Sequence, residues 1–360
     1  MTEDVLAGLL TEIEAAETAD RLRSLLSSGV RRLAPEADAG TAAQLAQSER
    51  LNRLHDAVIR RAVRLAEAEL AAEGATAPCP YDFVLFGSGG RGEQSVLSDQ
   101  DNGIVYAVPH PRQADAARRY FLRLGEAVRS ALVRAGYPPC PGKVVCSEPA
   151  WCRSVAEWAA QLDIWCADPT WDHVRHLLIV ADMRAVCGNG QLAAAVKERL
   201  RAAVRQSREL CAAMLRNTRH RQPAVGPLGN LLRVRYGPHT GGVEIKYGVY
   251  VPMVNAVRLL AVTNGVTATN TAERIACLHR RDALPDELAE RALRDFAHLL
   301  HLRAATADDG GDPPQSSGVV EARLLTRPVR RRLKSIIATA RQLHGAARTA
   351  VRRISGPFDD

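Results

Sequence analysis

The sequence is poor in aromatic residues and in long apolar runs. Aromatic side chains make up 4% of the 360 residues, which leaves few flat surfaces on which nucleobases could stack. No stretch of about 18 apolar residues occurs, so a transmembrane helix is excluded and no membrane partner is expected. The N-terminal sequence MTEDVLAGLLTEIEAAE is acidic where a signal peptide would be basic. We therefore expect a cytoplasmic protein.

The eight cysteines lack the spacing of a disulfide framework or a zinc site, because no Cys-x-x-Cys pair occurs. A chain of this length can bury a core without covalent cross-links, so free and mostly buried thiols are expected. Cys140, Cys146 and Cys152 recur at intervals of six residues. Ligand pairs of structural zinc sites sit closer together, which argues against a zinc site.

Positive charge gathers toward the C-terminus of a chain whose net charge is +8. Between Glu321 and Arg353 there are ten Lys or Arg and one acid. Such a face can bind nucleic acid or an anionic protein, but charge-rich helices are commonly solvated surfaces. Together with the shortage of aromatic residues, this argues against nucleic acid as a partner.

Apolar periodicity changes twice along the chain. Helical spacing covers residues 3–75, a Gly- and Pro-containing linker follows at 74–80, and strands alternate with helices as far as about 190. The remainder is mostly helical. We predict an α+β protein: a small mixed-sheet domain (78–190) flanked by an N-terminal helical segment (1–77) and a C-terminal all-helical domain (191–355).

The same periodicity predicts the individual elements. In the mixed domain, strands are expected at 82–87, 102–108 and 143–146, and helices at 112–135, 154–166 and 171–178, while the apolar run 177–186 suits a strand or a buried helix end. In the C-terminal domain, helices are expected at 191–218, 249–264, 270–281, 285–305 and 326–350, with irregular segments at 219–242 and 306–318.

A glycine-rich loop follows the first predicted strand. Gly87-x-Gly89-x-x-Gly92 matches the dinucleotide-binding fingerprint, which also requires an acid about 20 residues further on, after an intervening helix. Here Asp99 and Asp101 lie only seven and nine residues after Gly92. A Walker A loop is excluded as well, because no Gly-Lys-Ser/Thr follows. The loop therefore serves a different phosphate chemistry.

The short distance between the loop and the aspartates predicts metal-assisted chemistry on a nucleotide. Side chains at i and i+2 of an extended segment share one face, so Asp99 and Asp101 can converge on Mg²⁺, or on Mn²⁺ in its place. Gly87 and Ser88 offer backbone N–H groups to a polyphosphate, and Arg91 offers charge. These parts suit in-line attack at a nucleotide phosphorus.

This motif resembles that of a known superfamily. Gly87-Ser88-x-x-Arg91-x-Glu93, followed by Ser98-Asp99-x-Asp101, is similar to the Gly-Ser and Asp-x-Asp signature of the DNA polymerase β nucleotidyltransferases. The string GSGGRGEQSVLSDQDNGIVY resembles the branch that contains PII-uridylyltransferases and glutamine-synthetase adenylyltransferases. It is more similar still to bacterial nucleotidyltransferases that carry a C-terminal helical substrate-binding domain and are often fused to sensor domains. The resemblance covers roughly 50–355.

The resemblance implies further site residues. A third metal-binding carboxylate is expected at Asp182, which is polar within an apolar run, with Glu148 as the rival position and a buried salt bridge of Asp182 with an arginine as the alternative role. Lys246, in Glu244-Ile245-Lys246, is expected to face the nucleotide or the acceptor, although an exposed lysine is an equal alternative. Glu93 is expected to position Arg91 or the loop. No sensor domain precedes residue 80, so regulation is expected through the N-terminal helices, a partner protein or a homodimer.

The leading hypothesis is an Mg²⁺-dependent nucleotidyltransferase. It would bind an NTP, transfer the NMP to a hydroxyl of a protein or small-molecule acceptor, and release pyrophosphate. The catalytic set is Asp99, Asp101 and Asp182, which are also the metal ligands, and the nucleotide-binding set is Gly87, Ser88, Arg91 and Lys246. The alternative is a regulatory module that binds a nucleotide with little turnover, against which the intact aspartate pair argues.

Overall fold

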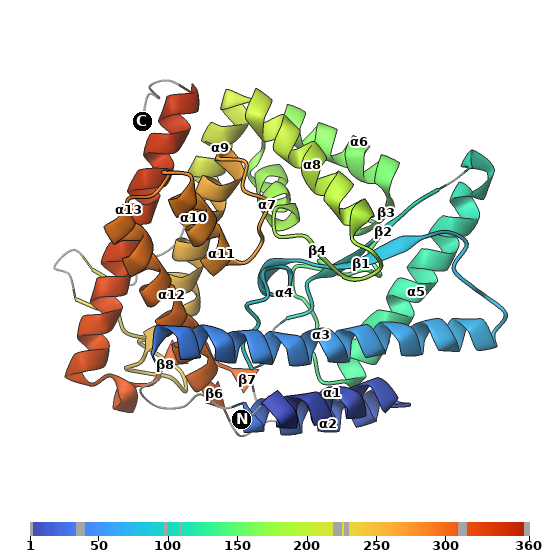
Figure 1. The fold of residues 1–360 in the computed structure, drawn as a ribbon, viewed down its shortest axis with the longest axis horizontal. Helices are drawn as coiled ribbons and strands as arrows, with labels where there is room; N and C mark the ends of the chain where they lie inside the picture. Colours follow the sequence, from blue (N-terminus) through green and yellow to red (C-terminus); the bar gives the residue numbers. More distant parts are fainter. Residues whose placement is uncertain are drawn as a thin grey trace.

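A central sheet with helices on both faces joins a helical C-terminal half (Figure 1). The structure is a computed structural model and describes residues 3–33, 40–96, 99–108, 110–218, 225–226, 230–308 and 315–355. Ser98 and parts of the predicted irregular segments 219–242 and 306–318 lie outside the described residues.

The sheet is mixed and has four strands in the order β3-β2-β1-β4. Its strands are β1 (Tyr81–Leu85), β2 (Asn102–Tyr106), β3 (Cys152–Ser154) and β4 (Arg184–Cys187). β1 pairs antiparallel with β2 and β4, whereas β2 pairs parallel with β3. The predicted α+β class with a small mixed sheet is confirmed.

Both faces of the sheet are buried, because successive strand side chains point to opposite sides. Phe83 and Ile104 belong to a core shared with α3 (Thr41–Ala72) and α5 (Ala114–Arg134). Val84 and Val105 belong to a second core shared with α6 (Val155–Ala167) and α8 (Gln191–Gln206). Figure 1 shows these two helix pairs on opposite sides of the strands.

The N-terminal helices share the first of these cores. α1 (Glu3–Ala15) and α2 (Ala19–Arg32) pack along α3. Leu26 and Leu54 are fully buried in the same cluster as Phe83. The change from helix to strand predicted near residue 78 is therefore a change of secondary structure within one continuous core.

The third strand was predicted at the wrong place. Residues 143–146 are not in a strand: Val145 lies in a bend and Cys146 in a turn, and Lys143 has a positive φ of 52°. A backbone turned this way after the Pro141-Gly142 pair cannot stay extended, so the segment forms no ladder with the described strands. It is held to Asn102 of β2 by two separate hydrogen bonds: Asn102 N donates to Val144 O at 3.0 Å, and Cys146 N donates to Asn102 Oδ1 at 2.9 Å. The parallel strand β3 instead begins six residues later, at Cys152.

The C-terminal half is helical, as predicted, apart from short two-residue ladders. Its helices are α9 (Arg208–Thr218), α10 (Val251–Thr263), α11 (Thr271–Arg280), α12 (Asp286–Ala305) and α13 (Arg327–Ser355). They are joined by α7 (Trp171–Val180), which precedes β4 in the chain and packs against α9. The ladders pair β5 (Val243–Glu244) with β8 (Val319–Val320) and β6 (Ala307–Asp308) with β7 (Gln315–Ser316). A π-helical turn, η2 (Lys246–Tyr250), leads into α10.

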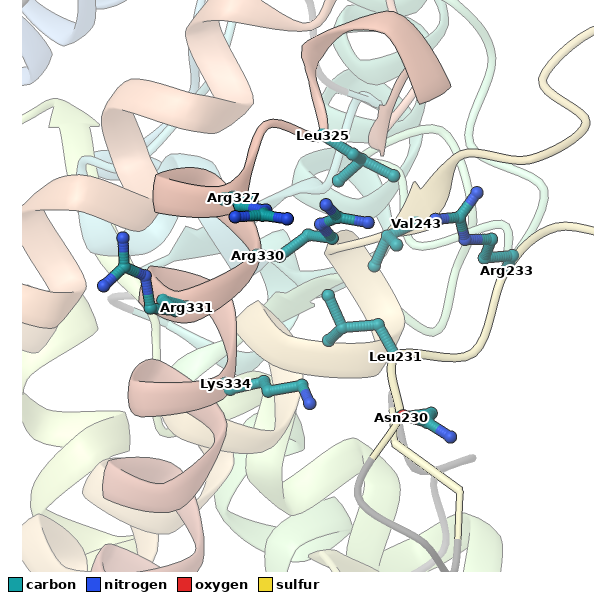
Figure 2. Close-up of a pocket in the computed structure, with 9 residues that line it drawn as sticks. All are labelled: Asn230, Leu231, Arg233, Val243, Leu325, Arg327, Arg330, Arg331 and Lys334. Atoms are coloured by element: carbon teal, nitrogen blue, oxygen red, sulfur yellow. The ribbon is translucent and has the colours of Figure 1, made fainter.

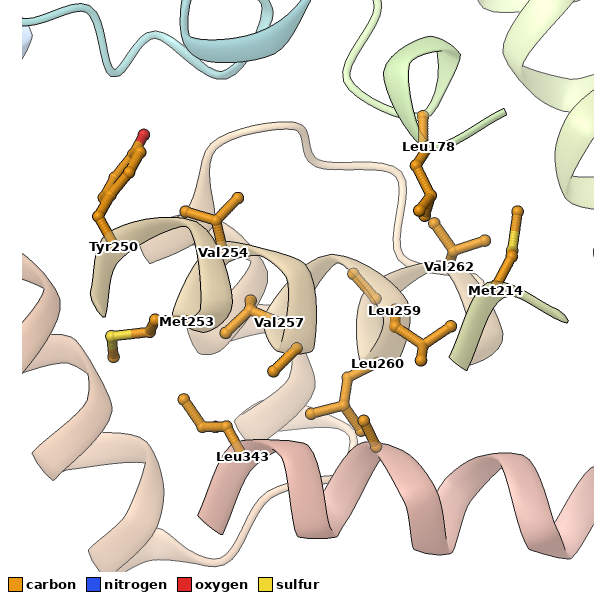
Figure 3. Packing of buried hydrophobic residues seen from close by; sticks show 14 of the residues in the cluster. Leu178, Met214, Tyr250, Met253, Val254, Val257, Leu259, Leu260, Val262 and Leu343 are labelled. Carbon is orange, nitrogen blue, oxygen red and sulfur yellow. The ribbon is translucent and has the colours of Figure 1, made fainter. Parts of the chain in front are cut away.

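α10 is the centre of this half. Every residue from Met253 to Val262 is buried, as expected of a helix that is apolar on nearly all sides. Figure 3 shows its side chains between Leu343 of α13, Met214 of α9 and Leu178 of α7. The same core continues to the sheet through Val84, so α10 is held in a fixed position relative to the glycine loop.

The remaining sequence expectations concern thiols and membranes. All eight cysteines are free, as predicted. No helix in the described part of the chain is long and apolar enough to cross a membrane.

Candidate active site

The glycine loop and the aspartate pair meet at one edge of the sheet. β1 and β2 are antiparallel, with Leu85 opposite Asn102, so the end of one strand lies beside the start of the other. Phe86 N donates to Asp101 O at 2.9 Å, which extends this pairing by one residue. Gly87 and Ser88 thereby line the same cleft as Asp99 and Asp101. The cleft has a volume of about 660 Å³.

Gly87 makes room for a carboxylate. Its φ is +51°, and a Cβ at this position would lie 2.6 Å from Asp101 Oδ2. Gly87 begins the short helical turn α4 (Gly87–Arg91). Further along that turn, Gly90 packs directly against the backbone oxygen of Asp182. Gly87 and Gly90 are thus required because Asp101 and the backbone of Asp182 lie too close to leave room for a side chain.

The two aspartates differ in their surroundings. The side chain of Asp99 is 43% exposed, and Lys246 Nζ lies 3.7 Å from its Oδ2. Asp101 is more buried and accepts a hydrogen bond from Cys140 Sγ at 3.1 Å. Burial, assisted by the charge of Asp99, raises the pKa of Asp101 above its ordinary value. A cation between the two carboxylates would relieve this cost.

The structure does not place Asp182 in the cleft, contrary to its predicted role as catalytic and metal-binding carboxylate. Asp182 is fully buried, and its oxygens pair with Arg91, Arg258 and Arg274. Burial alone would raise the pKa of Asp182, but Arg258, Arg91 and Arg274 together hold it below its usual value. The alternative noted for this residue, a buried salt bridge, is what the structure contains.

Arg91 belongs to the same cluster of buried charged side chains around Asp182. Its Nε donates to Glu93 Oε2 at 2.8 Å, its Nη2 donates to Tyr250 OH at 3.0 Å, and its Nη1 donates to Asp182. Its side chain is only 6% exposed, so the guanidinium contributes charge to the cleft wall while protein groups hold its donors. Glu93 positions Arg91, as predicted, and also accepts from the backbone N of Thr271 at 2.6 Å.

Helices α7, α10 and α12 supply cationic residues that were not predicted from the sequence. Arg175 of α7, Arg258 of α10 and Arg303 of α12 all line the cleft. Burial lowers the pKa of Arg258 to about 10, and its Nε is buried without a hydrogen-bond partner among the described residues. One signal was available: Asn255 and Arg258 are polar residues spaced i, i+3 in an otherwise apolar helix, and both line the cleft.

The lining of the cleft therefore combines several cationic side chains with a small acidic patch. Lys246 lines it from η2, as the sequence suggested. Asp99 and Asp101 are the only acidic residues among the described residues that line it. The rival position, Glu148, is half-buried in a turn outside this lining. No group of three or more His, Cys, Asp and Glu side chains within the described ranges could hold a metal alone.

The aspartate pair nevertheless fits Mg²⁺ or Mn²⁺. Carboxylate oxygens are the ligands that these hard cations prefer, and Mg²⁺ commonly keeps one or two protein carboxylates and completes its shell with phosphate and water. Burial and the charge of Asp99 keep the pKa of Asp101 raised even though Arg91 and Lys246 act to lower it. Asp99 and Asp101 are thus the residues that would hold the cation.

A Gly-Ser loop after one strand and an Asp-x-Asp pair before its antiparallel neighbour define the class of the domain: a nucleotidyltransferase of the mixed-sheet type. Residues 29–172 match the family model described as "Putative nucleotidyltransferase DUF294". Residues 208–351 match the model of its "Putative nucleotidyltransferase substrate binding domain". The chain belongs to this nucleotidyltransferase family with a C-terminal helical domain. A search among curated proteins found no match.

Proposed function

We propose that the protein transfers an NMP from an NTP to a hydroxyl of an acceptor with the help of Mg²⁺ or Mn²⁺. The observation that carries this proposal is the meeting of Gly87 and Ser88 with Asp99 and Asp101 in one cleft that cationic side chains also line. Family membership supports nucleotidyl transfer in general. The metal and the acceptor chemistry are inferred from the residues.

The proposed reaction needs no covalent enzyme intermediate. The acceptor hydroxyl oxygen forms a bond to the α-phosphorus, the bond from that phosphorus to the bridging oxygen of the β-phosphate breaks, and pyrophosphate leaves. The hydroxyl proton is released to solvent. A bound divalent cation supplies charge neutralisation on the phosphate oxygens.

The residues of this chain bind and orient the nucleotide. Gly87 and Ser88 allow the phosphates to approach the backbone, and Lys246 and Arg258, which line the same cleft, supply positive charge. Trp171 and Tyr247 are each 48% exposed and line the same cleft. Aromatic faces at a cleft mouth suit stacking with a nucleobase or a ring of the acceptor. The helical half thereby shapes the side from which the acceptor enters.

The test is transfer of label from an NTP that carries a labelled α-phosphate, incubated with cell extract. Asp99→Asn and Asp101→Asn should each lower labelling by about a thousandfold or more, because each removes a charge that holds the cation. Asp163→Asn is the matched control, since Asp163 forms an exposed pair with Arg199 outside the cleft. Undiminished labelling by both cleft variants would exclude the proposal.

Stability measurements separate loss of chemistry from loss of fold. Because burial raises the pKa of Asp101, its charge weakens folding above that pKa. Asp101→Asn should therefore be at least as stable as the wild type at neutral pH without metal. The difference should vanish below about pH 4, where the aspartate is protonated in both states.

Nucleotide binding without pyrophosphate release would instead support the alternative function, a regulatory module that binds a nucleotide with little turnover.

A further inference from the structure

A second pocket lies apart from the cleft, between the first turns of α13 and the segment 230–243. It has a volume of about 480 Å³ and shares no lining residue with the cleft. Figure 2 shows the side chains that surround it. The basic ones, which we call the basic pocket residues, are Arg233, Arg327, Arg330, Arg331 and Lys334.

The basic residues of α13 that line this pocket form one face of the helix. Arg327, Arg330, Arg331 and Lys334 stand at i, i+3, i+4 and i+7, the spacing of neighbours on a helix surface. Leu333 points instead into the core and is fully buried. Since α13 begins at Arg327, the positive end of its dipole adds to this charge. From the sequence, this helix could present either a binding face or a solvated face, and the structure shows Arg327, Arg330, Arg331 and Lys334 lining a concavity.

The charge of the pocket is uncompensated within the described part of the chain. No acidic side chain lines it, and none of the basic pocket residues forms an ion pair with a described carboxylate. Nearby arginines that face elsewhere are paired: Arg332 with Asp295 at 3.1 Å, and Arg323 with Glu321. Like charges held together in a concave site attract an anion.

The shape of the pocket favours a small ligand. Its volume falls in the range of small-molecule sites, about 300–1,000 Å³. Leu231, Val243 and Leu325 give it an apolar wall, while no aromatic residue lines it in the described ranges, so bases of a nucleic acid would find no stacking surface. Several guanidinium groups around one concavity match the oxygens of linked phosphates.

We propose that the basic pocket binds the di- or triphosphate group of a small molecule, at a site separate from the nucleotide cleft. The inference does not depend on the proposed transfer reaction. The pocket is connected to the cleft through the β5–β8 ladder. Val243 lines the pocket, and two residues beyond it Ile245 N donates to Gly318 O at 2.8 Å. Gly318 and Lys246 both line the cleft.

The test is titration calorimetry of the full chain with sodium tripolyphosphate at fixed ionic strength, without metal. Lys246→Glu serves as the background that weakens anion binding in the cleft. In this background, the added pair Arg330→Glu and Lys334→Glu should weaken binding at least about tenfold, because two charges reverse. The matched control is Arg341→Glu with Arg348→Glu, which reverses two exposed charges of α13 outside the pocket.

Each outcome of the titration either supports or overturns the proposed oligophosphate site. Binding lost in the pocket pair and kept in the control pair supports the proposal, provided that both melt like their parent. An equal loss of tripolyphosphate affinity in both pairs would mean general attraction to a charged helix. Unchanged affinity in both pairs would mean that the pocket binds no oligophosphate. Either result would overturn the proposal. ATP that binds more tightly than tripolyphosphate identifies a nucleotide as the source of the phosphates. A single-stranded oligonucleotide that binds more tightly than either would overturn the proposal in favour of a nucleic-acid surface.

Discussion

At the scale of single residues, the cleft depends on how closely Gly87 approaches Asp101. Gly87 combines a left-handed backbone with a position 2.6 Å from Asp101 Oδ2 for any added Cβ. Gly92, in the same loop, also has a left-handed φ of +63°, but a Cβ there would meet nothing within 4 Å. Substituting each glycine by alanine therefore distinguishes the effect of backbone strain from the steric effect of a methyl group on Asp101.

Gly87→Ala should reduce transfer by about tenfold or more, because its methyl group displaces Asp101. Gly92→Ala should lose a similar amount of stability, about 1–2 kcal/mol from the left-handed backbone, with nearly normal transfer. The measurements are kcat/KM for the NTP and thermal melting of both variants. Equal activity of the two would show that the position of Asp101 does not limit the reaction.

At the scale of elements, a buried charge cluster joins the glycine loop to the C-terminal helices. Arg91 comes from α4, Arg258 from α10 and Arg274 from α11, and all three pair with Asp182. Arg274 also donates to Ala181 O at 2.9 Å. Glu93 shares the compensation of Arg91, whereas Arg258 and Arg274 pair with Asp182, so the packing of the loop against the helical half depends on this carboxylate.

Asp182→Asn should lower the free energy of unfolding by about 3–5 kcal/mol, because it leaves buried arginines uncompensated. Urea unfolding measures this loss. Asp163→Asn, in an exposed ion pair, should lose less than about 1 kcal/mol. The pKa of Asp182 is depressed in the folded state, so its stabilisation is present above the unfolded pKa and lost as the pH falls through the folded pKa.

The deficit of Asp182→Asn relative to the wild type should accordingly shrink in acid. A variant with wild-type stability and no transfer activity would instead restore Asp182 as a direct participant in the reaction. That result would require Asp182 to leave the arginine cluster when a nucleotide binds.

At the scale of the whole molecule, the long helix α3 ties the N-terminal helices to the loop that carries the aspartates. His55 of α3 is fully buried, with Nε2 2.9 Å from Ser95 O and Nδ1 2.8 Å from Tyr137 OH. The carbonyl oxygen of Ser95 can only accept, so Nε2 of His55 carries the proton and Nδ1 accepts from Tyr137 OH. The next residue of α3, Asp56, pairs with Arg184, whose Nη2 donates to Gly89 O at 2.7 Å.

Acid should destabilise the whole protein through His55. Burial lowers its pKa from 6.5 to about 4, so the unfolded state binds a proton at a pH where the folded state does not. The resulting stability is present above pH 6.5 and is lost as the pH falls toward 4, by up to about 3 kcal/mol.

Unfolding by urea at several pH values measures this slope. His55→Gln should flatten it, whereas His279→Gln, which alters an exposed pair with Asp286, should leave it as in the wild type. An unchanged slope in His55→Gln would assign the acid sensitivity to other groups. His298, whose burial also lowers its pKa to about 4, is the first to test next.

Features that depend on near neighbours in the chain could be predicted from the sequence alone. The strand, glycine loop and Asp-x-Asp lie within about twenty residues of one another, so spacing alone excluded a dinucleotide fold and predicted which backbone and carboxylates meet. Helix spans followed from apolar periodicity for the same reason. The strand predicted at 143–146 failed because a turn at Lys143 outweighed a short apolar run.

The roles of charged residues with distant partners could be read only from the folded chain. Asp182 and Arg91 appeared suited to metal and phosphate, yet Arg258 and Arg274, more than seventy residues further along the chain, neutralise Asp182 away from the cleft. The basic run of α13 became a pocket only because the segment 230–243 folds against it. Pairing of buried charges is set by packing in space, which no local pattern encodes.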